Sequence, residues 1–534
     1  MKNIEQIILA NLLKGRVIEA EGVLSENLAQ LTNPLAKNIE GIIARFKGDE
    51  SYAEHLFRES ILVDRTFTPA KLNLANSLIS QGRYGDALPF AKAGFEESSP
   101  KTLQCVLPYL TALLDTAKAD EALNIIGSLP DSLKRDRQIQ LATASCLRSL
   151  GDYSKAISIL EALMQQDPSD IIATRIYADV RGEADVRFNP IPFYDRCLEL
   201  AKKRKKAAIA PIKWNMSLHL LRRREFVRGW EYYDAGLDAS VGSLGRSLPA
   251  PVRRYSQLDL HSLDRNRWSL IVVEQGIGDQ VLFLSALNDI QADLNKIVLI
   301  CERRMFPILS RSFPSIQLAL PGLLEGLEIT SFPFNGIAPI GSLQKNYRAS
   351  IADYTRSKRP FLKVDRKSYN DFRAQLLDEA KGKTIVGISW KGGFWENQQR
   401  NKAIELKNWE SLFNRNDVYL VNLQYGDLTK DMKWLEERNF HLRTFPEVDF
   451  KKDLDTWLSI SAACDGIISV STALVHFAGA VNQKVAVVMP DVQGPWILGI
   501  DDTRSIVYPN VHYFRKGARE TNDELIQRVI RIIR

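Results

Sequence analysis

Three short segments in the second half of the chain carry residue types that suit group transfer from an anionic donor to a nucleophile. The first follows an apolar run and opens an amphipathic one. Its glycines permit a sharp turn and let a ligand approach the backbone, while a carboxylate in the first helical turn can cap the helix or accept a proton. A Gly-x-Gly turn is weakly specific, because the third glycine of a dinucleotide fingerprint is missing. The residues of this segment are Glu274, Gln275, Gly276, Gly278 and Asp279.

The second segment joins a glycine pair to three basic side chains and follows a β-rich run. Lysine and arginine neutralise phosphate oxygens directly, so this grouping suits an anionic ligand such as a diphosphate. A solvated basic loop is the alternative interpretation. Its members are Lys391, Gly392, Gly393, Arg400 and Lys402.

The third segment, residues 469–476, ends a predicted strand and begins a helix that should run to about Ala480. Ser471 or Thr472 is a natural N-cap, so free N–H groups and the helix dipole favour an anion there. His476 comes four residues after Thr472 and therefore lies on the same helical face. It is either a side chain that contacts the donor or a packed helical residue.

The elements that must position these segments alternate strand and helix from Trp268 onward. This alternation is typical of parallel sheets and predicts two Rossmann-like lobes, 269–375 and 376–534, facing one cleft. Ligands of such folds sit beyond the carboxyl ends of the strands, where the three segments fall. A single helix is predicted over 278–294. Strands are predicted at 268–274, 296–302, 383–390, 417–423, 441–445, 465–471 and 484–490.

The first half of the chain is a repeat array. Glycine can end the first helix of a pair in the left-handed region, and alanine lets the second helix pack closely on the first. Such pairs bury their apolar faces only by stacking, which predicts an α-solenoid with a concave groove over residues 1–237. The phased alanines are Ala20, Ala53, Ala87, Ala122 and Ala156, with spacings of 33, 34, 35 and 34 residues. Five residues before them stand Gly15, Gly48, Gly82, Ala117 and Gly151.

Three stretches near the end of this array have no clear phase. A basic run at 202–206 can contact anionic lipid or nucleic acid, but a solvated helix face is the commoner origin of such a run. Residues 215–237 again look helical and fit a last, divergent repeat. Residues 238–268, of which 238–256 are rich in Ser, Gly, Pro and Arg, are predicted to be a linker.

The composition limits the class of protein. With 534 residues, 45% hydrophobic and 25% charged, the chain has room for two to four domains and is not disordered throughout. A net charge of +7 is too small on a chain of this length to indicate nucleic acid. The five cysteines are scattered, so neither a zinc site nor a disulfide framework is expected. No apolar run approaches a membrane span and the N-terminus resembles an amphipathic helix, so we expect a soluble, cytoplasmic protein.

The repeats resemble the tetratricopeptide family, most closely in GDYSKAISILEALMQQDPSD (151–170). The second half resembles bacterial tetratricopeptide-containing glycosyltransferases related to lipopolysaccharide heptosyltransferases, and more distantly the O-linked N-acetylglucosamine transferases. The segments that carry this second resemblance are REFVRGWEYY (224–233), VVEQGIGDQVLFLSAL (272–287), VGISWKGG (386–393), RNKAIELKNW (400–409), VNLQYG (421–426), DGIISVSTALVHFAGAVNQKVAVVMP (465–490) and PWILGIDDTRSIVYPNVHYFR (495–515).

The resemblance implies a GT-B fold, in which the first lobe holds the acceptor and the second lobe the nucleotide sugar. It also implies metal-independent transfer with inversion, with Asp279 as the base. Ser471 stands where the family commonly has aspartate; serine caps a helix equally well, but any contact of that carboxylate with the nucleotide is lost. The donor-binding residues that the resemblance implies are Lys402, with Arg400 and Lys391 as rivals, and Thr472 and His476 on the third segment.

These features together predict a glycosyltransferase whose repeats dock an acceptor protein. Flagellin or another bacterial surface protein is the acceptor class that similar architectures suggest. No cofactor is expected apart from the nucleotide-sugar substrate, and no metal. Two alternatives stay open: a transferase acting on a lipopolysaccharide or other glycan acceptor, and a non-catalytic repeat scaffold with a vestigial transferase half.

Overall fold

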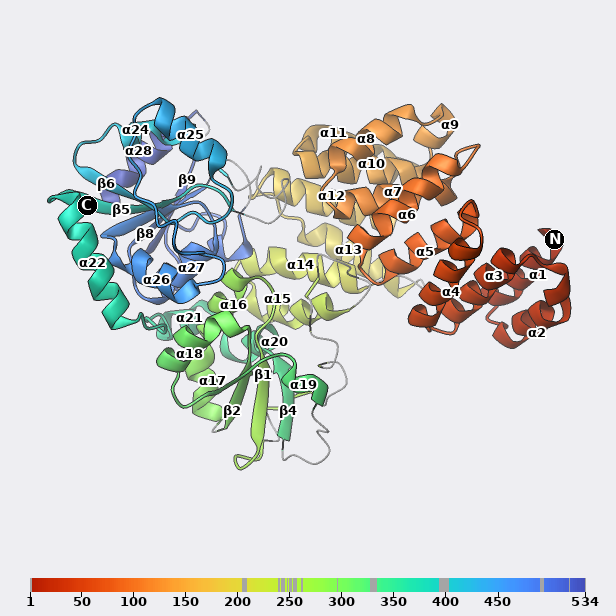
Figure 1. The fold of residues 1–534 in the computed structure, drawn as a ribbon, viewed down its shortest axis with the longest axis horizontal. Helices are drawn as coiled ribbons and strands as arrows, with labels where there is room; N and C mark the ends of the chain where they lie inside the picture. The colour runs from red at the N-terminus through yellow and green to blue at the C-terminus, as the bar shows by residue number, and fades with distance from the viewer. Residues whose placement is uncertain are drawn as a thin grey trace. The chain divides into compact units, whose positions relative to one another are not determined.

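The chain divides into two compact units in a computed structural model, Met1–Val180 and Arg181–Arg534. Figure 1 shows the first unit as helices alone and the second as helices around two sheets. The structure describes residues 2–203, 209–238, 241, 245–246, 248, 252, 257–260, 263–294, 296–326, 334–392, 403–489, 494–517 and 519–533.

Antiparallel helix pairs build the first unit, each pair packing on the next (Figure 1). Their apolar faces meet in a series of small cores along the array rather than in one centre, as expected of a solenoid. The helices are α1 (Lys2–Leu13), α2 (Val17–Asn27), α3 (Asn33–Phe46), α4 (Glu50–Val63), α5 (Thr68–Ser80), α6 (Tyr84–Glu97), α7 (Leu103–Asp115), α8 (Ala119–Ser128), α9 (Asp131–Lys134), α10 (Arg137–Leu150), α11 (Tyr153–Gln166) and α12 (Ile171–Ala184).

The predicted repeat phase is confirmed at the turns and at the helix contacts. All five turn residues have positive φ, including Ala117 at +62°, the one turn where alanine replaces glycine. The five phased alanines have no exposed surface, because each lies where two helices meet. The glycines of the other turns, with their φ values, are Gly15 (+75°), Gly48 (+85°), Gly82 (+73°) and Gly151 (+81°).

The turn at Ala117 should be improved by glycine. A residue with a Cβ costs roughly 1–2 kcal/mol in the left-handed region, and glycine removes this strain. Glycine also makes the unfolded chain more flexible, which cancels part of the gain in stability. We therefore expect Ala117→Gly to raise the free energy of unfolding of the first unit by about 0.5–1 kcal/mol, as measured by thermal melting followed by circular dichroism. Gly151→Ala is the matched control and should be destabilising, since no atom lies within 4 Å of the added Cβ and only backbone strain changes. Equal melting of Ala117→Gly and the wild type would contradict this reading of the turn.

The second unit begins with helices that continue the hairpin pattern, α13 (Ile191–Lys202), α14 (Ala210–Arg222) and α15 (Phe226–Tyr233), followed by the 3₁₀ turn η2 (Asp234–Leu237). The predicted divergent repeat corresponds to the α14–α15 hairpin. Its turn has Arg224 at φ +67°, and Gly229, five residues later, lets α15 approach Leu221 closely.

Two parallel sheets follow this hairpin, so the predicted fold class of a helical-repeat solenoid with two Rossmann-like lobes is confirmed (Figure 1). The first sheet has the order β3-β2-β1-β4 and the second β6-β5-β7-β8-β9. Every ladder in both sheets is parallel. The strands are β1 (Trp268–Val272), β2 (Ile297–Ile300), β3 (Gln317–Ala319), β4 (Phe334–Pro339), β5 (Thr384–Ser389), β6 (Val418–Asn422), β7 (Gly466–Ser469), β8 (Val485–Met489) and β9 (Val511–Arg515).

Helices alternate with the strands of both sheets along the chain. Those of the first sheet are α16 (Ile277–Leu284), α17 (Leu287–Asp293), α18 (Phe306–Ser312), α19 (Leu323–Gly326), α20 (Ile340–Tyr347) and α21 (Ile351–Arg356). Those that follow are α22 (Arg366–Ala380), α24 (Glu410–Phe413), α25 (Thr429–Glu437), α26 (Leu454–Ala463), α27 (Ala473–Ala480) and α28 (Asn522–Ile533).

Two predicted elements differ from the structure. The single helix expected over 278–294 is broken into α16 and α17, because Arg348 binds the carbonyl oxygen of Ser285 (2.8 Å) at the break. The strand expected over 441–445 is reduced to one bridge between Arg443 and Val421. Pro446 follows it directly and has no N–H to extend the pairing.

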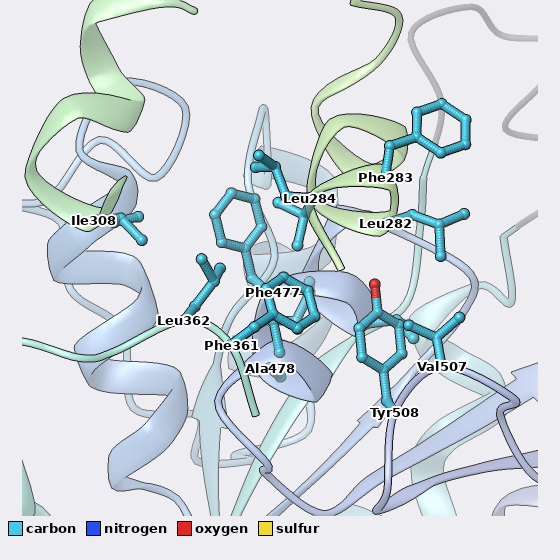
Figure 2. Close-up of a cluster of buried hydrophobic side chains, with 14 of the residues drawn as sticks. Leu282, Phe283, Leu284, Ile308, Phe361, Leu362, Phe477, Ala478, Val507 and Tyr508 are labelled. Atoms are coloured by element: carbon cyan, nitrogen blue, oxygen red, sulfur yellow. The ribbon is translucent and has the colours of Figure 1, made fainter. Parts of the chain in front are cut away.

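A shared core joins the two sheets of this unit. It contains buried side chains from α15, α16, α26 and α27. Figure 2 shows part of it, with Leu284 of α16 beside Phe477 of α27 and Phe283 on the other side of α16. The backbone N–H groups of Phe361 and Leu362 both donate to the carbonyl oxygen of Ala480 (3.0 and 3.2 Å), which ties the connection between the sheets to the end of α27.

Trp230 of α15 contacts both halves of this core. Its ring lies 6.1 Å from that of Phe283 and 5.3 Å from that of Trp496, both edge to face. Its indole N–H donates to the carbonyl oxygen of Arg348 (3.0 Å). The last helical hairpin is therefore an integral part of the core that holds the two sheets.

Candidate active site

The strand order of each sheet reverses at one point, and the three predicted segments lie at these two points. In the first sheet the reversal is between β1 and β4, and the loop after β1 carries residues 274–279. In the second it is between β5 and β7, which are followed by residues 390–393 and 470–476. Crevices of this kind, outside the carboxyl ends of parallel strands, are where α/β folds bind ligands.

The start of α16 touches the start of α27. A Cβ placed on Gly278 would lie 3.0 Å from Cδ2 of His476 and 3.3 Å from the Cα of Ala473. A side chain at this position would therefore be tightly packed against the approaching helix, and glycine avoids this crowding. The contact brings the first predicted segment against the third, although about 190 residues separate them in the sequence.

The turn after β5 meets the same helix start. A Cβ on Gly392 would lie 2.8 Å from Cγ2 of Thr472 and 3.3 Å from the carbonyl oxygen of Ser471. All three segments thus converge on the first turn of α27. Gly393, Arg400 and Lys402, which were predicted for the second segment, lie outside the described residues.

Asp279 lies in the first turn of α16, with its carboxylate turned back toward the helix start. A Cβ on Gly276, the N-cap residue, would be 3.2 Å from Oδ2 of Asp279. The charge of Asp279 contributes to raising the pKa values of two buried tyrosines, Tyr233 and Tyr508, for which burial is the larger cause. The carboxylate is therefore close to side chains from both sides of the convergence.

Thr472 is the N-cap residue of α27, but its side chain does not cap the helix by a hydrogen bond. Its hydroxyl instead lies 3.2 Å from that of Ser469, and the residue is buried. Ser471 precedes it and is partly exposed. The first turn of α27 therefore directs its positive end toward the convergence, and the Thr472 side chain does not cap it.

Lys391 is engaged with carboxylate and backbone oxygens. Its Nζ donates to Oδ2 of Asp431 (2.8 Å) and to the carbonyl oxygen of Asp427 (2.7 Å). A ligand phosphate would have to compete with Asp431 for this cation. Lys391 is the one of the three predicted basic residues that the structure describes, and its side chain is thus paired with a residue of α25.

Glu274 lies beneath the loop rather than in the cleft. Its carboxylate is buried and accepts hydrogen bonds from Arg246 (2.8 and 3.3 Å) and from the backbone N–H of Gly341 (3.0 Å). Arg246 is itself fully buried and also binds Asp234 (2.8 Å). This network joins the loop after β1 to the start of α20, across the reversal point of the first sheet.

Gln275 and Tyr233 form a second link to the last helical hairpin. Gln275 has φ +72°, which is strained for a residue with a side chain. Its amide donates to the hydroxyl of Tyr233 (2.6 Å), which is buried. Sequence reasoning missed Tyr233 as a site residue, although it stands in one of the segments that carry the family resemblance.

Gln424 is a second residue that sequence reasoning missed. Its side-chain oxygen accepts hydrogen bonds from the Ser389 hydroxyl and from the backbone N–H groups of Trp390 and Lys391, at 2.9–3.0 Å. It is buried at the end of β6 and so fixes the turn after β5. The VNLQYG segment was the signal that could have identified it.

A cavity of about 610 Å³ opens beside Gln424, beyond the carboxyl end of β6. Its walls combine aromatic and apolar side chains with the carboxylates of Asp427 and Asp449 and the ammonium of Lys451. Hydrogen bonds within their own turns, from Thr429 and Lys451 respectively, lower the pKa values of both aspartates. The cavity therefore carries more negative than positive charge.

His476 is buried on α27, and burial lowers its pKa to about 4. The imidazole is therefore neutral at pH 7. Its Nδ1 lies 3.0 Å from the hydroxyl of Tyr508. In this structure the side chain is thus a neutral imidazole, which is compatible with a role as a neutral hydrogen-bond donor.

The buried neutral imidazole should make the second unit less stable in acid. In the unfolded chain His476 binds a proton below its ordinary pKa of 6.5, whereas the folded protein takes it up only near pH 4. The stabilisation is complete above pH 6.5 and is lost as pH falls toward 4, by about 3 kcal/mol in total. We expect urea unfolding between pH 7 and 4.5 to show this loss in the wild type and a flatter profile in His476→Gln. Parallel profiles would contradict the assignment.

No family model matches the chain. Protein FlbA of Caulobacter vibrioides is 27% identical over 391 residues, which cover 64% of this chain and 64% of that protein, just under two thirds of its length. Solved structures similar to the chain include a tetratricopeptide repeat protein from Parabacteroides merdae, at 16% identity, covering 45% of this chain and 93% of that one with a TM-score of 0.35. They also include the ADP-heptose lipopolysaccharide heptosyltransferase II of E. coli, at 13% identity, covering 50% and 98% with a TM-score of 0.35.

In the part of the chain that the structure describes, no helix combines the length and the apolar character needed to cross a membrane. No group of three or more His, Cys, Asp and Glu side chains in these residues is arranged to hold a metal ion. Metal-independent chemistry stays a prediction.

Proposed function

We propose that this protein transfers a glycosyl group from a nucleotide sugar to a hydroxyl of an acceptor protein, with inversion and without a metal ion. The observation that carries the proposal is the convergence of Asp279 with the first turn of α27, which Thr472 does not cap, at the reversal points of two parallel sheets. A carboxylate on one side and a helix start on the other are what a hydroxyl nucleophile and an anionic leaving group require.

The proposed chemistry assigns one role to each side of the convergence. The acceptor hydroxyl attacks the anomeric carbon while Asp279 takes its proton, and the bond from that carbon to the nucleotide diphosphate breaks. The diphosphate gains negative charge, which the N–H groups at the start of α27 stabilise. From the sequence, Lys402 is the cation expected to share this role, with Arg400 as a rival. Lys391, the other rival, is engaged with Asp431.

The nucleoside half of the donor is proposed to lie in the cavity beside Gln424. The carboxylates of Asp427 and Asp449 disfavour a phosphate there, while the aromatic walls and hydroxyl-accepting oxygens suit a base and a ribose. The turn after β5, which Gln424 fixes, separates this cavity from the start of α27. The donor would thus have its base on the β6 side and its diphosphate on the α27 side.

The solenoid is proposed to dock the acceptor, for which flagellin or another bacterial surface protein is the candidate class. Its support is the stacking of helix pairs in the first unit and the family resemblance of the repeats. Intact-mass analysis of candidate proteins co-expressed with the chain tests this assignment, with the Asp279→Asn chain as the control. If the sugar is found only on glycan or lipid-linked acceptors, the protein-acceptor hypothesis is wrong and the alternative substrate class takes its place.

Lys402→Ala should weaken the binding of nucleoside diphosphates and their sugars. A charge-assisted hydrogen bond contributes about 1.5–3 kcal/mol, so the dissociation constant should rise roughly 10- to 100-fold. Calorimetric titration with ADP-, GDP-, UDP- and CDP-sugars checks this, and Lys407→Ala is the matched control, since Lys407 is exposed and paired with Glu405. Unchanged affinity in Lys402→Ala would move the role to Arg400 or Lys391.

A further inference from the structure

His476 and Tyr508 form a buried pair beside the convergence of the three segments. The rings lie 5.8 Å apart, edge to face, and Nδ1 of His476 is 3.0 Å from the Tyr508 hydroxyl. Tyr508 is 2% exposed and comes from the loop before β9, so the pair joins α27 to a different part of the sheet. Figure 2 shows the Tyr508 hydroxyl directed toward α16.

The surroundings hold Tyr508 in one position. A Cβ on Gly479 would lie 2.6 Å from its ring, so the ring packs directly on α27. Its backbone N–H donates to the hydroxyl of Ser505 (3.1 Å), and the Phe361 ring stacks on it at 6.3 Å. The hydroxyl is therefore a fixed group on which the imidazole can be oriented.

Both members of the pair are uncharged at neutral pH. Burial, with the nearby charge of Asp279 as a lesser cause, keeps the pKa of Tyr508 well above 10, so the hydroxyl retains its proton. Since His476 is also neutral, one of its two ring nitrogens carries a hydrogen and the other does not. If the hydroxyl donates to Nδ1, the tyrosine proton is bonded and the imidazole proton stands on Nε2. If Nδ1 donates instead, the buried tyrosine proton needs another acceptor, and Nδ1 is the hydrogen-bond partner that the described structure gives this hydroxyl.

The opposite edge of the imidazole faces the start of α16. Its Cδ2 is the atom that a Cβ on Gly278 would approach to 3.0 Å. Nε2 is bonded to Cδ2 and lies away from Nδ1 on the ring. A proton on Nε2 is therefore on the side of the ring that faces the start of α16, beside the first turn of α27, where the proposed diphosphate lies.

We propose that Tyr508 is a positioning residue, which donates to Nδ1 of His476 and so holds the imidazole with its proton on Nε2, aimed at a diphosphate oxygen of the donor. This inference rests on the proposed function. A neutral N–H donor fits this place, because it binds the diphosphate without the cost of burying a cation. Tyr508 itself touches neither the donor nor the acceptor in this arrangement.

The ring-nitrogen chemical shifts of ¹⁵N-labelled histidine report the tautomer directly, and the chain has only six histidines to resolve. The His476 signals are assigned by their absence in His476→Gln. We expect the wild type to carry its proton on Nε2 and Tyr508→Phe to show a mixture of tautomers. Tyr347→Phe is the matched control, because it removes another hydrogen-bonded tyrosine hydroxyl, on α20, and should leave the His476 signals unchanged.

Titration with ADP, GDP, UDP and CDP completes the test. Tyr508→Phe should weaken the diphosphate that the wild type binds by about tenfold, as expected for one misdirected hydrogen bond, while Tyr347→Phe binds as the wild type does. A proton on Nδ1 in the wild type, or full affinity in Tyr508→Phe, overturns the role of the pair alone. If the wild type binds none of these nucleotides, the proposed function falls and this role falls with it, even where the tautomer is as expected.

Discussion

The Asp279→Asn variant is expected to lose most glycosyl transfer while binding the nucleotide sugar as the wild type does. Asparagine has nearly the same shape but cannot take a proton from the acceptor hydroxyl. General-base catalysis contributes about 10²- to 10⁴-fold, so the turnover number should fall by that factor. The measurement is single-turnover transfer from the nucleotide sugar that the titrations identify, with the dissociation constant of the donor measured in parallel.

Loss of a carboxylate from a helix start also changes the helix itself, by about 0.3–1 kcal/mol. Asp523→Asn controls for this effect, because Asp523 stands in the first turn of α28, away from the convergence. It should retain full turnover. Unchanged turnover in Asp279→Asn would remove Asp279 from the mechanism, and a loss of donor affinity equal to the loss of turnover would indicate a binding role in place of proton transfer.

Arg246→Met is expected to destabilise the second unit by about 3–5 kcal/mol, the cost of leaving a buried charge without its partner. The side chain of Glu274 is 1% exposed and would lose both hydrogen bonds from the guanidinium. Asp234 would be less affected, since it keeps contacts with Lys345 and Ser342. Urea unfolding followed by tryptophan fluorescence measures the change, because all nine tryptophans of the chain follow residue 180 and report on this unit alone.

The double variant Arg246→Met/Glu274→Gln separates two effects: the loss of the ion pair between Arg246 and Glu274, and the burial of a Glu274 carboxylate without a partner. A neutral glutamine still accepts the N–H of Gly341, and no unpaired carboxylate remains at the reversal point. The double variant should therefore be more stable than Arg246→Met by about 1–2 kcal/mol. If the two variants unfold at the same urea concentration, the network stabilises the unit through packing of the arginine stem rather than through charge.

The features that could be predicted from the sequence are those determined by residues that lie close together in the chain. A left-handed turn five residues before a tightly packed alanine repeats along the first unit, so the period alone locates the helix pairs. The alternation of apolar strands and amphipathic helices likewise places Asp279, Thr472 and His476 at carboxyl strand ends. In each case the deciding residues lie within a few positions of one another.

The features that sequence reasoning missed depend on partners far apart in the chain. Gln275 meets Tyr233 across 42 residues, and Gln424 meets Ser389 across 35. The pairing of Lys391 with Asp431 was missed for the same reason. From the sequence alone, Lys391 is a candidate phosphate ligand, but in the structure its ammonium group binds this carboxylate. The break between α16 and α17 was missed for this reason too, since it depends on Arg348.

The contacts of the α14–α15 hairpin with the sheets limit where this chain can be joined to a related chain in a chimaera. Trp230 lies in the core between the sheets, and Tyr233 holds Gln275 of the loop that leads to Asp279. A fragment that begins at the first strand would lack both side chains, whereas the helix pairs up to Val180 form a compact body of their own. Exchange of repeats between related chains should therefore leave the second unit whole, provided that the crossover falls before this hairpin.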